Sequence, residues 1–186
     1  MTEFLAGGRR RIDRVLAPDF LLDLTDLPLD EVRERRIDAD QEEADLSYAR
    51  RLLQGRIDLL RAEQSSRDGR GPLARHPRTD AEIVDALKRI LTDRPQEESA
   101  PPRHLSLEPS RVGEHRREAE RAVADLGGSD LGALDDTALA EAIADLSTIE
   151  GRVSRARRQV QIVVDTLTDE VARRYRLGEV SLAEHR

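Results

Sequence analysis

The chain has 186 residues, of which 37% are charged and only 2% aromatic, and its formal net charge is −7. This composition suits long helices that bury one narrow apolar seam better than it suits a large globular core. The lack of cysteine excludes disulfides and zinc–thiolate sites, the acidic total argues against direct nucleic-acid binding, and the lack of an 18-residue apolar run or apolar leader predicts a cytoplasmic protein without a membrane span.

The N-terminal arm, residues 1–28, combines the basic cluster Arg9–Arg11 with an apolar stretch that Pro18 and Pro28 interrupt. Because proline breaks regular helices, we expect this arm to be partly ordered and to dock on the helices or on a partner. Residues 29–66 follow without proline and with a single glycine. Acidic residues at the start of this range favour a helix N-terminus, so the range predicts a first long helix.

Residues 67–134 form a linker that begins with a stretch rich in Gly, Pro, Ser and Arg. Thr79 suits the N-cap of a short amphipathic helix, which Asp93 to Pro95 would end. A second short helix is expected over about 110–125, just before a pair of glycines. The linker is therefore predicted to hold two short helices between mobile loops.

Residues 135–178 predict a second long helix, with Asp135 as its N-cap and Gly178 at its end. Tyr175, near the end of this helix, is expected to dock onto the coiled coil that the two long helices form. Residues 179–186 are left as a short tail.

A pattern of five polar residues occurs once in each long helix. Both copies read E-x3-S-x2-R-x3-Q-x3-D, and they lie 107 residues apart. The steps follow the helical period of 3.6, so each copy lies along one stripe of its helix. The ten residues are Glu43, Ser47, Arg50, Gln54, Asp58, Glu150, Ser154, Arg157, Gln161 and Asp165.

An apolar stripe with the spacing of a coiled-coil seam runs beside each polar stripe. Its residues are Leu46, Ala49, Leu53, Ile57 and Leu60 in the first helix, and Val153, Ala156, Val160, Val164 and Leu167 in the second. The seam allows parallel or antiparallel pairing. The antiparallel arrangement is favoured because a two-fold axis then relates the two motifs and brings Arg50 and Arg157 near one level. The predicted fold class is all-α: two long helices in an antiparallel coiled coil, with short connecting helices.

The polar stripe in a single copy could be an ordinary solvated helix face with i,i+4 pairs. The duplication argues against that explanation, because three seam residues change between the copies while the five polar types do not. Arginine matches the O6 and N7 atoms of guanine, and aspartate can accept from its N1–H and amino groups. Formal charge sums to +1 over 43–61 and +2 over 150–165, and Arg51 and Arg158 can face phosphates.

The doubled motif on paired helices resembles that of the RsiG family, actinobacterial anti-sigma factors that use cyclic di-GMP. The resemblance covers both long helices and most of the chain. It implies that two molecules of cyclic di-GMP bind as a dimer, held by the ten motif residues. It also implies that the loaded protein sequesters a WhiG-type sporulation sigma factor and so represses its transcription.

Two other classes of function remain open from the residues. One is a coiled-coil adaptor that binds no ligand, and the other is an enzyme that processes a nucleotide. The four histidines are scattered over loops, a surface helix and the tail, without the spacing of a metal site. No phosphate-binding loop, nucleophile elbow or HExxH motif occurs, so we expect no catalytic residues and no enzymatic activity.

Overall fold

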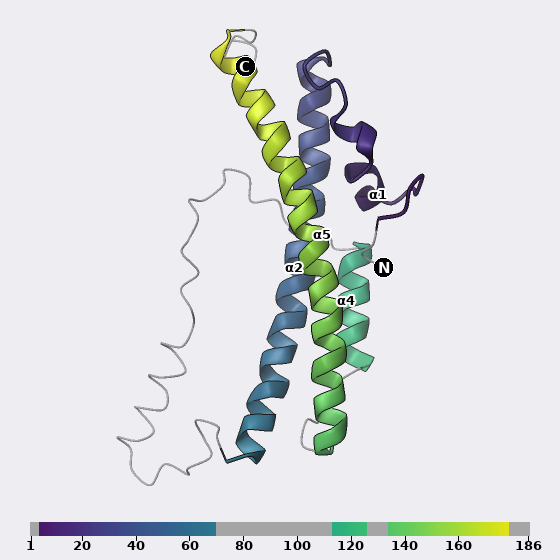
Figure 1. The fold of residues 1–186 in the computed structure, drawn as a ribbon, viewed down its shortest axis with the longest axis vertical. Helices are drawn as coiled ribbons and strands as arrows, with labels where there is room; N and C mark the ends of the chain where they lie inside the picture. The colour runs from purple at the N-terminus through teal and green to yellow at the C-terminus, as the bar shows by residue number, and fades with distance from the viewer. Residues whose placement is uncertain (1–3, 70–112, 126–133, 179–186) are drawn as a thin grey trace, which may run out of the picture. The chain divides into compact units, whose positions relative to one another are not determined.

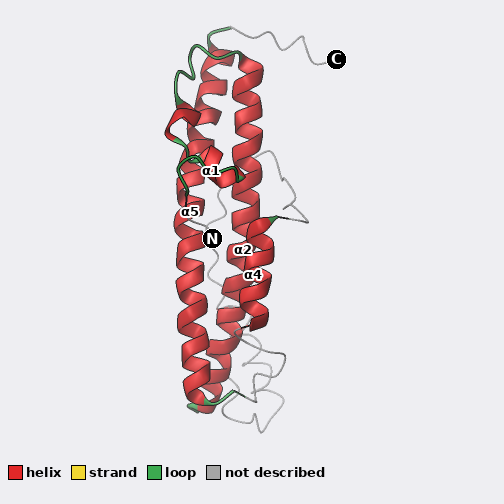
Figure 2. Cartoon of the chain, turned by 90° about the vertical axis from the view of Figure 1, so that its right-hand side faces the viewer, coloured by secondary structure: helices red, strands yellow, loops and turns green. Residues whose placement is uncertain are grey.

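The computed structural model describes residues 4–69, 113–125 and 134–178. All regular structure in these ranges is helical, which confirms the expected all-α class (Figure 2). In chain order the elements are α1 (Arg11–Val15), the 3-10 helix η1 (Pro18–Leu21), α2 (Leu29–Arg67), α4 (Glu114–Asp125) and α5 (Asp136–Arg176), coloured along the chain in Figure 1. The short helix expected after Thr79 and the tail 179–186 lie outside the described residues.

The described residues fall into two compact units. The first contains residues 4–51, 113–120 and 150–178, and the second contains residues 52–69, 121–125 and 134–149. Each long helix contributes to both units, so each unit has its own part of α2 and its own part of α5.

The ends of the long helices follow local sequence signals. α2 begins at Leu29, as expected, with two acidic residues in its first turn. Asp135 caps α5, because its side-chain Oδ1 accepts a hydrogen bond of 2.7 Å from the backbone N–H of Ala138. After α5, Gly178 has φ +68°, the left-handed conformation that glycine adopts without steric cost at a helix C-terminus.

All ten residues of the predicted seam are buried. In the first unit these are Leu46, Ala49, Val153, Ala156, Val160, Val164 and Leu167, and in the second they are Leu53, Ile57 and Leu60. Leu139 and Leu146 of α5 are also buried in the second unit, each with 0% exposure. Each unit therefore has an apolar core to which both long helices contribute, as the 3-and-4 spacing predicts.

Contacts between α2 and α5 in the first unit run in opposite order along the two helices. Arg33, early in α2, lies over the ring of Tyr175, late in α5, at 5.8 Å from its centroid, and its guanidinium donates to the tyrosine hydroxyl. Glu43, later in α2, accepts a hydrogen bond from Arg157, earlier in α5. This order is consistent with antiparallel packing, and Tyr175 packs against Arg33 of α2.

The N-terminal arm is part of the first unit and is more ordered than its prolines suggested. Ile12 and Val15 of α1 are each 1% exposed. Arg174 of α5 donates to the backbone carbonyls of Leu24 and Leu27, with 2.7 Å to the latter, and so holds the end of the arm. We expected a partly ordered arm and did not predict α1, because a helix of five residues leaves no periodic pattern.

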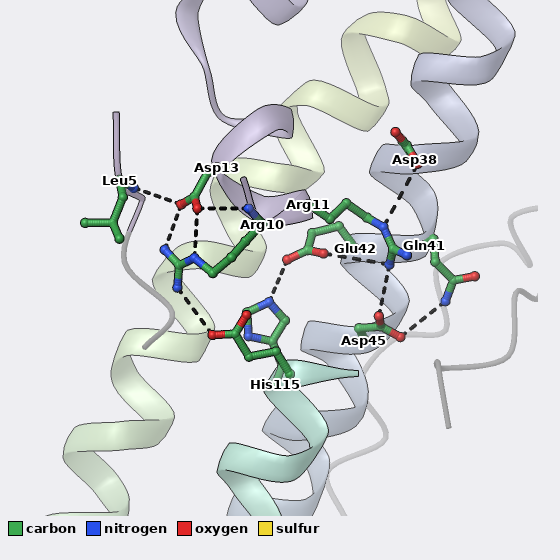
Figure 3. A network of polar contacts seen from close by, with 10 residues as sticks. Leu5, Arg10, Arg11, Asp13, Asp38, Gln41, Glu42, Asp45 and His115 are labelled. Atoms are coloured by element: carbon green, nitrogen blue, oxygen red, sulfur yellow. Dashed lines mark hydrogen bonds and ion pairs between the residues drawn. The ribbon is translucent and has the colours of Figure 1, made fainter. Parts of the chain in front are cut away.

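The buried carboxylate of Asp13 links two other parts of the arm through hydrogen bonds (Figure 3). Its carboxylate is 2% exposed and accepts hydrogen bonds from the Arg10 guanidinium at 2.7 and 2.8 Å and from the backbone N–H of Leu5 at 2.9 Å. The bonds from Arg10, followed by those from backbone N–H groups, lower the pKa of Asp13 from 3.8 to about 2. This carboxylate is therefore charged in the folded protein and compensated by its donors.

A second set of polar contacts joins the arm and α4 to α2 (Figure 3). His115 of α4 is 5% exposed and its Nε2 lies 2.6 Å from a carboxylate oxygen of Glu42. Arg11 donates to Asp45 at 3.1 Å and lies 3.9 Å from Glu42. The sequence predicted His115 on a surface helix, and this prediction is wrong for its side chain. The imidazole is buried because Glu42 supplies it with a polar partner.

Two adjacent leucines of α2 give a matched test of the seam. Leu60 is 0% exposed and Leu59 is 55% exposed. We expect Leu60→Ala to lower the free energy of unfolding by about 2–5 kcal/mol, because it leaves a cavity in the core. Leu59→Ala should change it by less than about 0.5 kcal/mol. Urea unfolding followed by far-ultraviolet circular dichroism measures both, and equal effects would contradict the assigned helix rotation.

The lowered pKa of Asp13 predicts an acid-dependent contribution to stability. A carboxylate whose folded-state pKa is depressed stabilises the fold above its unfolded pKa, and this contribution disappears as pH falls toward the folded value. Asp13→Asn should therefore be less stable than the unmodified protein at pH 7. The difference between their free energies of unfolding should shrink between roughly pH 5 and pH 2. A difference that stays constant over that range, in urea titrations, would show that the Asp13 charge does not contribute.

Candidate ligand-binding site

The ten motif residues are divided between the two long helices and the two units. α2 carries Glu43 to Asp58 and α5 carries Glu150 to Asp165. The first unit contains all five residues of the α5 copy together with Glu43, Ser47 and Arg50 of the α2 copy. The last two residues of the α2 copy, Gln54 and Asp58, belong to the second unit.

The same hydrogen bond forms inside each copy of the motif. The Ser47 hydroxyl donates to Oε1 of Glu43 at 2.8 Å, and the Ser154 hydroxyl donates to Oε1 of Glu150 at 2.7 Å. Residues four apart on a helix face one another, so the spacing of the motif creates this pair in both places. The repeat in the sequence is therefore also a repeat in side-chain geometry.

One contact joins the two copies across the helix pair. Nη1 of Arg157 donates a hydrogen bond of 3.0 Å to Oε1 of Glu43. The side chains of Arg157 and Glu43 are 29% and 25% exposed, so the ion pair lies partly out of solvent. Residue patterns alone did not predict this contact, because it depends on the register between α2 and α5. The expectation that Arg50 and Arg157 lie at one level stays a prediction.

Exposure changes along the stripe in the same direction in both copies. The glutamate, serine and arginine are half-buried in each copy, whereas Asp58 and Asp165 are exposed. The copies differ at the glutamine, since Gln54 is exposed and Gln161 is half-buried. The amide of Gln161 donates to Asp165 at 3.4 Å. Each stripe thus runs from the edge of the buried seam to open solvent.

Two hollows in the first unit lie apart from the motif. One, of about 280 Å³, is lined by residues of α1, α2 and α4 that include Arg11, Glu42 and His115. The other, of about 470 Å³, is lined mainly by the arm. No motif residue lines either of them. A ligand bound by the motif residues would therefore lie outside both of these hollows.

Two further arginines flank the stripe at equivalent positions. Arg51 and Arg158 are exposed, and neither forms a hydrogen bond or ion pair with any residue that the structure describes. By contrast, the ring of Tyr48, beside Ser47, already has a partner. The guanidinium of Arg116 from α4 lies 4.9 Å from the ring centroid. The residue patterns did not predict this contact between Tyr48 and Arg116.

Within the described ranges, no three histidine, cysteine or acidic side chains come together in a way that could hold a metal ion. None of the helices in these ranges combines the length and the apolarity needed to cross a membrane.

Comparison with known families agrees with the duplicated motif. The sequence matches the family described as RsiG-like over residues 18–91 and 125–185, which together exceed half of the chain. These ranges include both long helices and all ten motif residues. A search of curated proteins finds no match. The family match, over ranges that carry both copies of the motif, identifies this chain as a member of the RsiG-like family.

Proposed function

We propose that this protein is an anti-sigma factor that depends on cyclic di-GMP. In this proposal α2 and α5 form an antiparallel coiled coil, and the two motif copies hold a dimer of cyclic di-GMP. The loaded protein sequesters a WhiG-type sporulation sigma factor and represses the transcription that this factor directs. The observation that carries the proposal is the duplicated motif, with its repeated Ser–Glu bond, in a chain of the RsiG-like family.

The chemistry of the stripe supports a guanine nucleotide. The guanidinium of an arginine offers parallel donors for O6 and N7 of guanine, and an aspartate can accept from the N1–H and amino groups that adenine does not present. In both copies the arginine is half-buried beside the seam and the aspartate is exposed. A ligand made of two equivalent halves suits a surface that repeats these groups twice.

The proposed regulation follows from placing the ligand on an open surface. A nucleotide bound along the stripe would form part of the surface that the sigma factor contacts. Affinity for the sigma factor would then increase with ligand, and affinity for ligand would increase with the sigma factor by the same factor. We propose binding without turnover, so cyclic di-GMP incubated with the protein should be recovered intact by chromatography.

A coiled-coil adaptor that binds no ligand is the second candidate. The observation that favours it is the Arg157–Glu43 hydrogen bond. This bond joins α2 and α5 without any ligand, which is the role that polar contacts have in a purely structural coiled coil. Gel filtration with the sigma factor, with and without cyclic di-GMP, separates the candidates. Co-elution that requires the ligand supports the anti-sigma factor, whereas co-elution independent of ligand supports the adaptor.

The two motif arginines give the direct test of ligand binding. We expect Arg50→Ala combined with Arg157→Ala to weaken binding of cyclic di-GMP by at least about 30-fold, since each arginine–guanine pair contributes about 1–3 kcal/mol. Isothermal titration calorimetry measures the affinity. Arg121→Ala combined with Arg176→Ala removes the same charge from exposed positions outside the motif and should leave binding unchanged. Intact binding in the motif variant would contradict the assignment.

Variants at Arg51 and Arg158 test how much contacts with the phosphates contribute to ligand affinity. Replacing both with alanine should weaken binding of cyclic di-GMP about 5-fold and reduce its dependence on salt, because exposed charge pairs are weak and screened. Replacing both with lysine keeps the charge and should preserve most of the affinity. Titrations at low and high ionic strength measure both effects. A salt dependence unchanged in the alanine variant would mean that neither side chain faces a phosphate.

A further inference from the structure

Glu43 receives two donors on one oxygen, and the donors come from different helices. The hydroxyl of Ser47, on α2, donates to Oε1 at 2.8 Å, and Nη1 of Arg157, on α5, donates to the same atom at 3.0 Å. Both partners of the cross-helix pair are about three-quarters buried. A carboxylate held in this way by its own helix has little freedom, so it fixes the position of the guanidinium that reaches it.

The remaining donors of Arg157 determine what the guanidinium can still bind. Its Nε is buried and has no hydrogen-bond partner among the described residues. Nη1 donates to Glu43. A guanidinium carries five N–H groups, so the contact with Glu43 leaves the N–H groups of Nη2 and the second N–H of Nη1 for a ligand. These are the groups that can form a forked pair with a guanine edge.

Charge argues against a direct contact between Glu43 and the ligand. Cyclic di-GMP carries two phosphodiester groups, each with one negative charge, and a carboxylate facing them would be repelled. In its observed place Glu43 is neutralised by Arg157 and accepts from Ser47. Its charge is therefore used inside the protein and does not oppose the approach of an anion.

We propose that Glu43 is a positioning residue, which holds the guanidinium of Arg157 in the orientation that reads guanine and does not itself contact the nucleotide. Ser47 supports this role by fixing the Glu43 side chain. An arginine that is already oriented loses less rotamer freedom on binding, so its contact with the ligand is stronger. The inference rests on the proposed function, because it assigns one motif residue a role in that same site.

A double-mutant cycle on ligand affinity tests the inference. Calorimetry with cyclic di-GMP would compare the unmodified protein with Glu43→Ala, Arg157→Ala and the combination of the two. We expect Glu43→Ala to weaken binding about 10-fold in the unmodified background, in line with the loss of a charge-assisted hydrogen bond. In the Arg157→Ala background the same change should have no further effect, because Glu43 then has no guanidinium to orient.

Two controls separate positioning from a general loss of structure. Glu43→Gln keeps the shape and an acceptor oxygen, so it should retain more affinity than Glu43→Ala. Glu34→Ala removes the same charge from an exposed position of α2 and should bind as the unmodified protein does. Circular dichroism melting curves confirm that each variant is folded. If Glu43→Ala destabilised the whole molecule, it would weaken binding equally in both backgrounds.

The outcomes distinguish the inference from the function on which it rests. Equal weakening in both backgrounds would mean that Glu43 acts without Arg157, and no weakening in either would mean that Glu43 is dispensable; both results overturn the positioning role. If the unmodified protein does not bind cyclic di-GMP at all, the proposed function fails, and the positioning role fails with it. A cycle of the same variants on urea unfolding would still measure the Glu43–Arg157 contact itself.

Discussion

Burial of the apolar seam fixes the rotation of each long helix about its own axis, and every motif residue takes its orientation from that rotation. The seam residues are all buried, and the polar stripe begins one step further round each helix. The glutamate, serine and arginine of each copy therefore lie at the edge of the core, while the aspartates reach solvent. A rotation of either helix would remove its seam from the core and move its motif, so the packing of the helices and the orientation of the motif are determined together.

Neighbouring residues of α2 contact different helices because successive side chains point in different directions around a helix. Glu42 is 2% exposed and meets His115 of α4 and Arg11 of the arm, whereas Glu43 meets Arg157 of α5. Successive residues are separated by about 100° around a helix, so one turn of α2 can hold two partners at once. This turn therefore joins the arm and α4 to the helix that carries the second copy of the motif.

The features predicted from the sequence are those set by short-range patterns. The 3-and-4 spacing of apolar residues predicts the seam, and the capping preference of aspartate predicts Asp135 as an N-cap; the structure confirms both. The features that were missed depend on chain segments far apart in the sequence. The Arg157–Glu43 bond requires the register between two helices, and the burial of His115 requires a carboxylate 73 residues away. No local pattern contains that information.

The proposed binding of an anion is compatible with a chain of net charge −7. Carboxylates near the α2 copy are engaged by donors within the first unit: Glu42 faces His115, Glu43 faces Arg157 and Asp45 faces Arg11. Arg51 and Arg158, at matching places beside the two copies, form no such pairs within the described residues. These three carboxylates are thus compensated inside the protein, while Arg51 and Arg158 remain toward solvent. The local balance of paired and unpaired charge, and not the total, determines what this surface can attract.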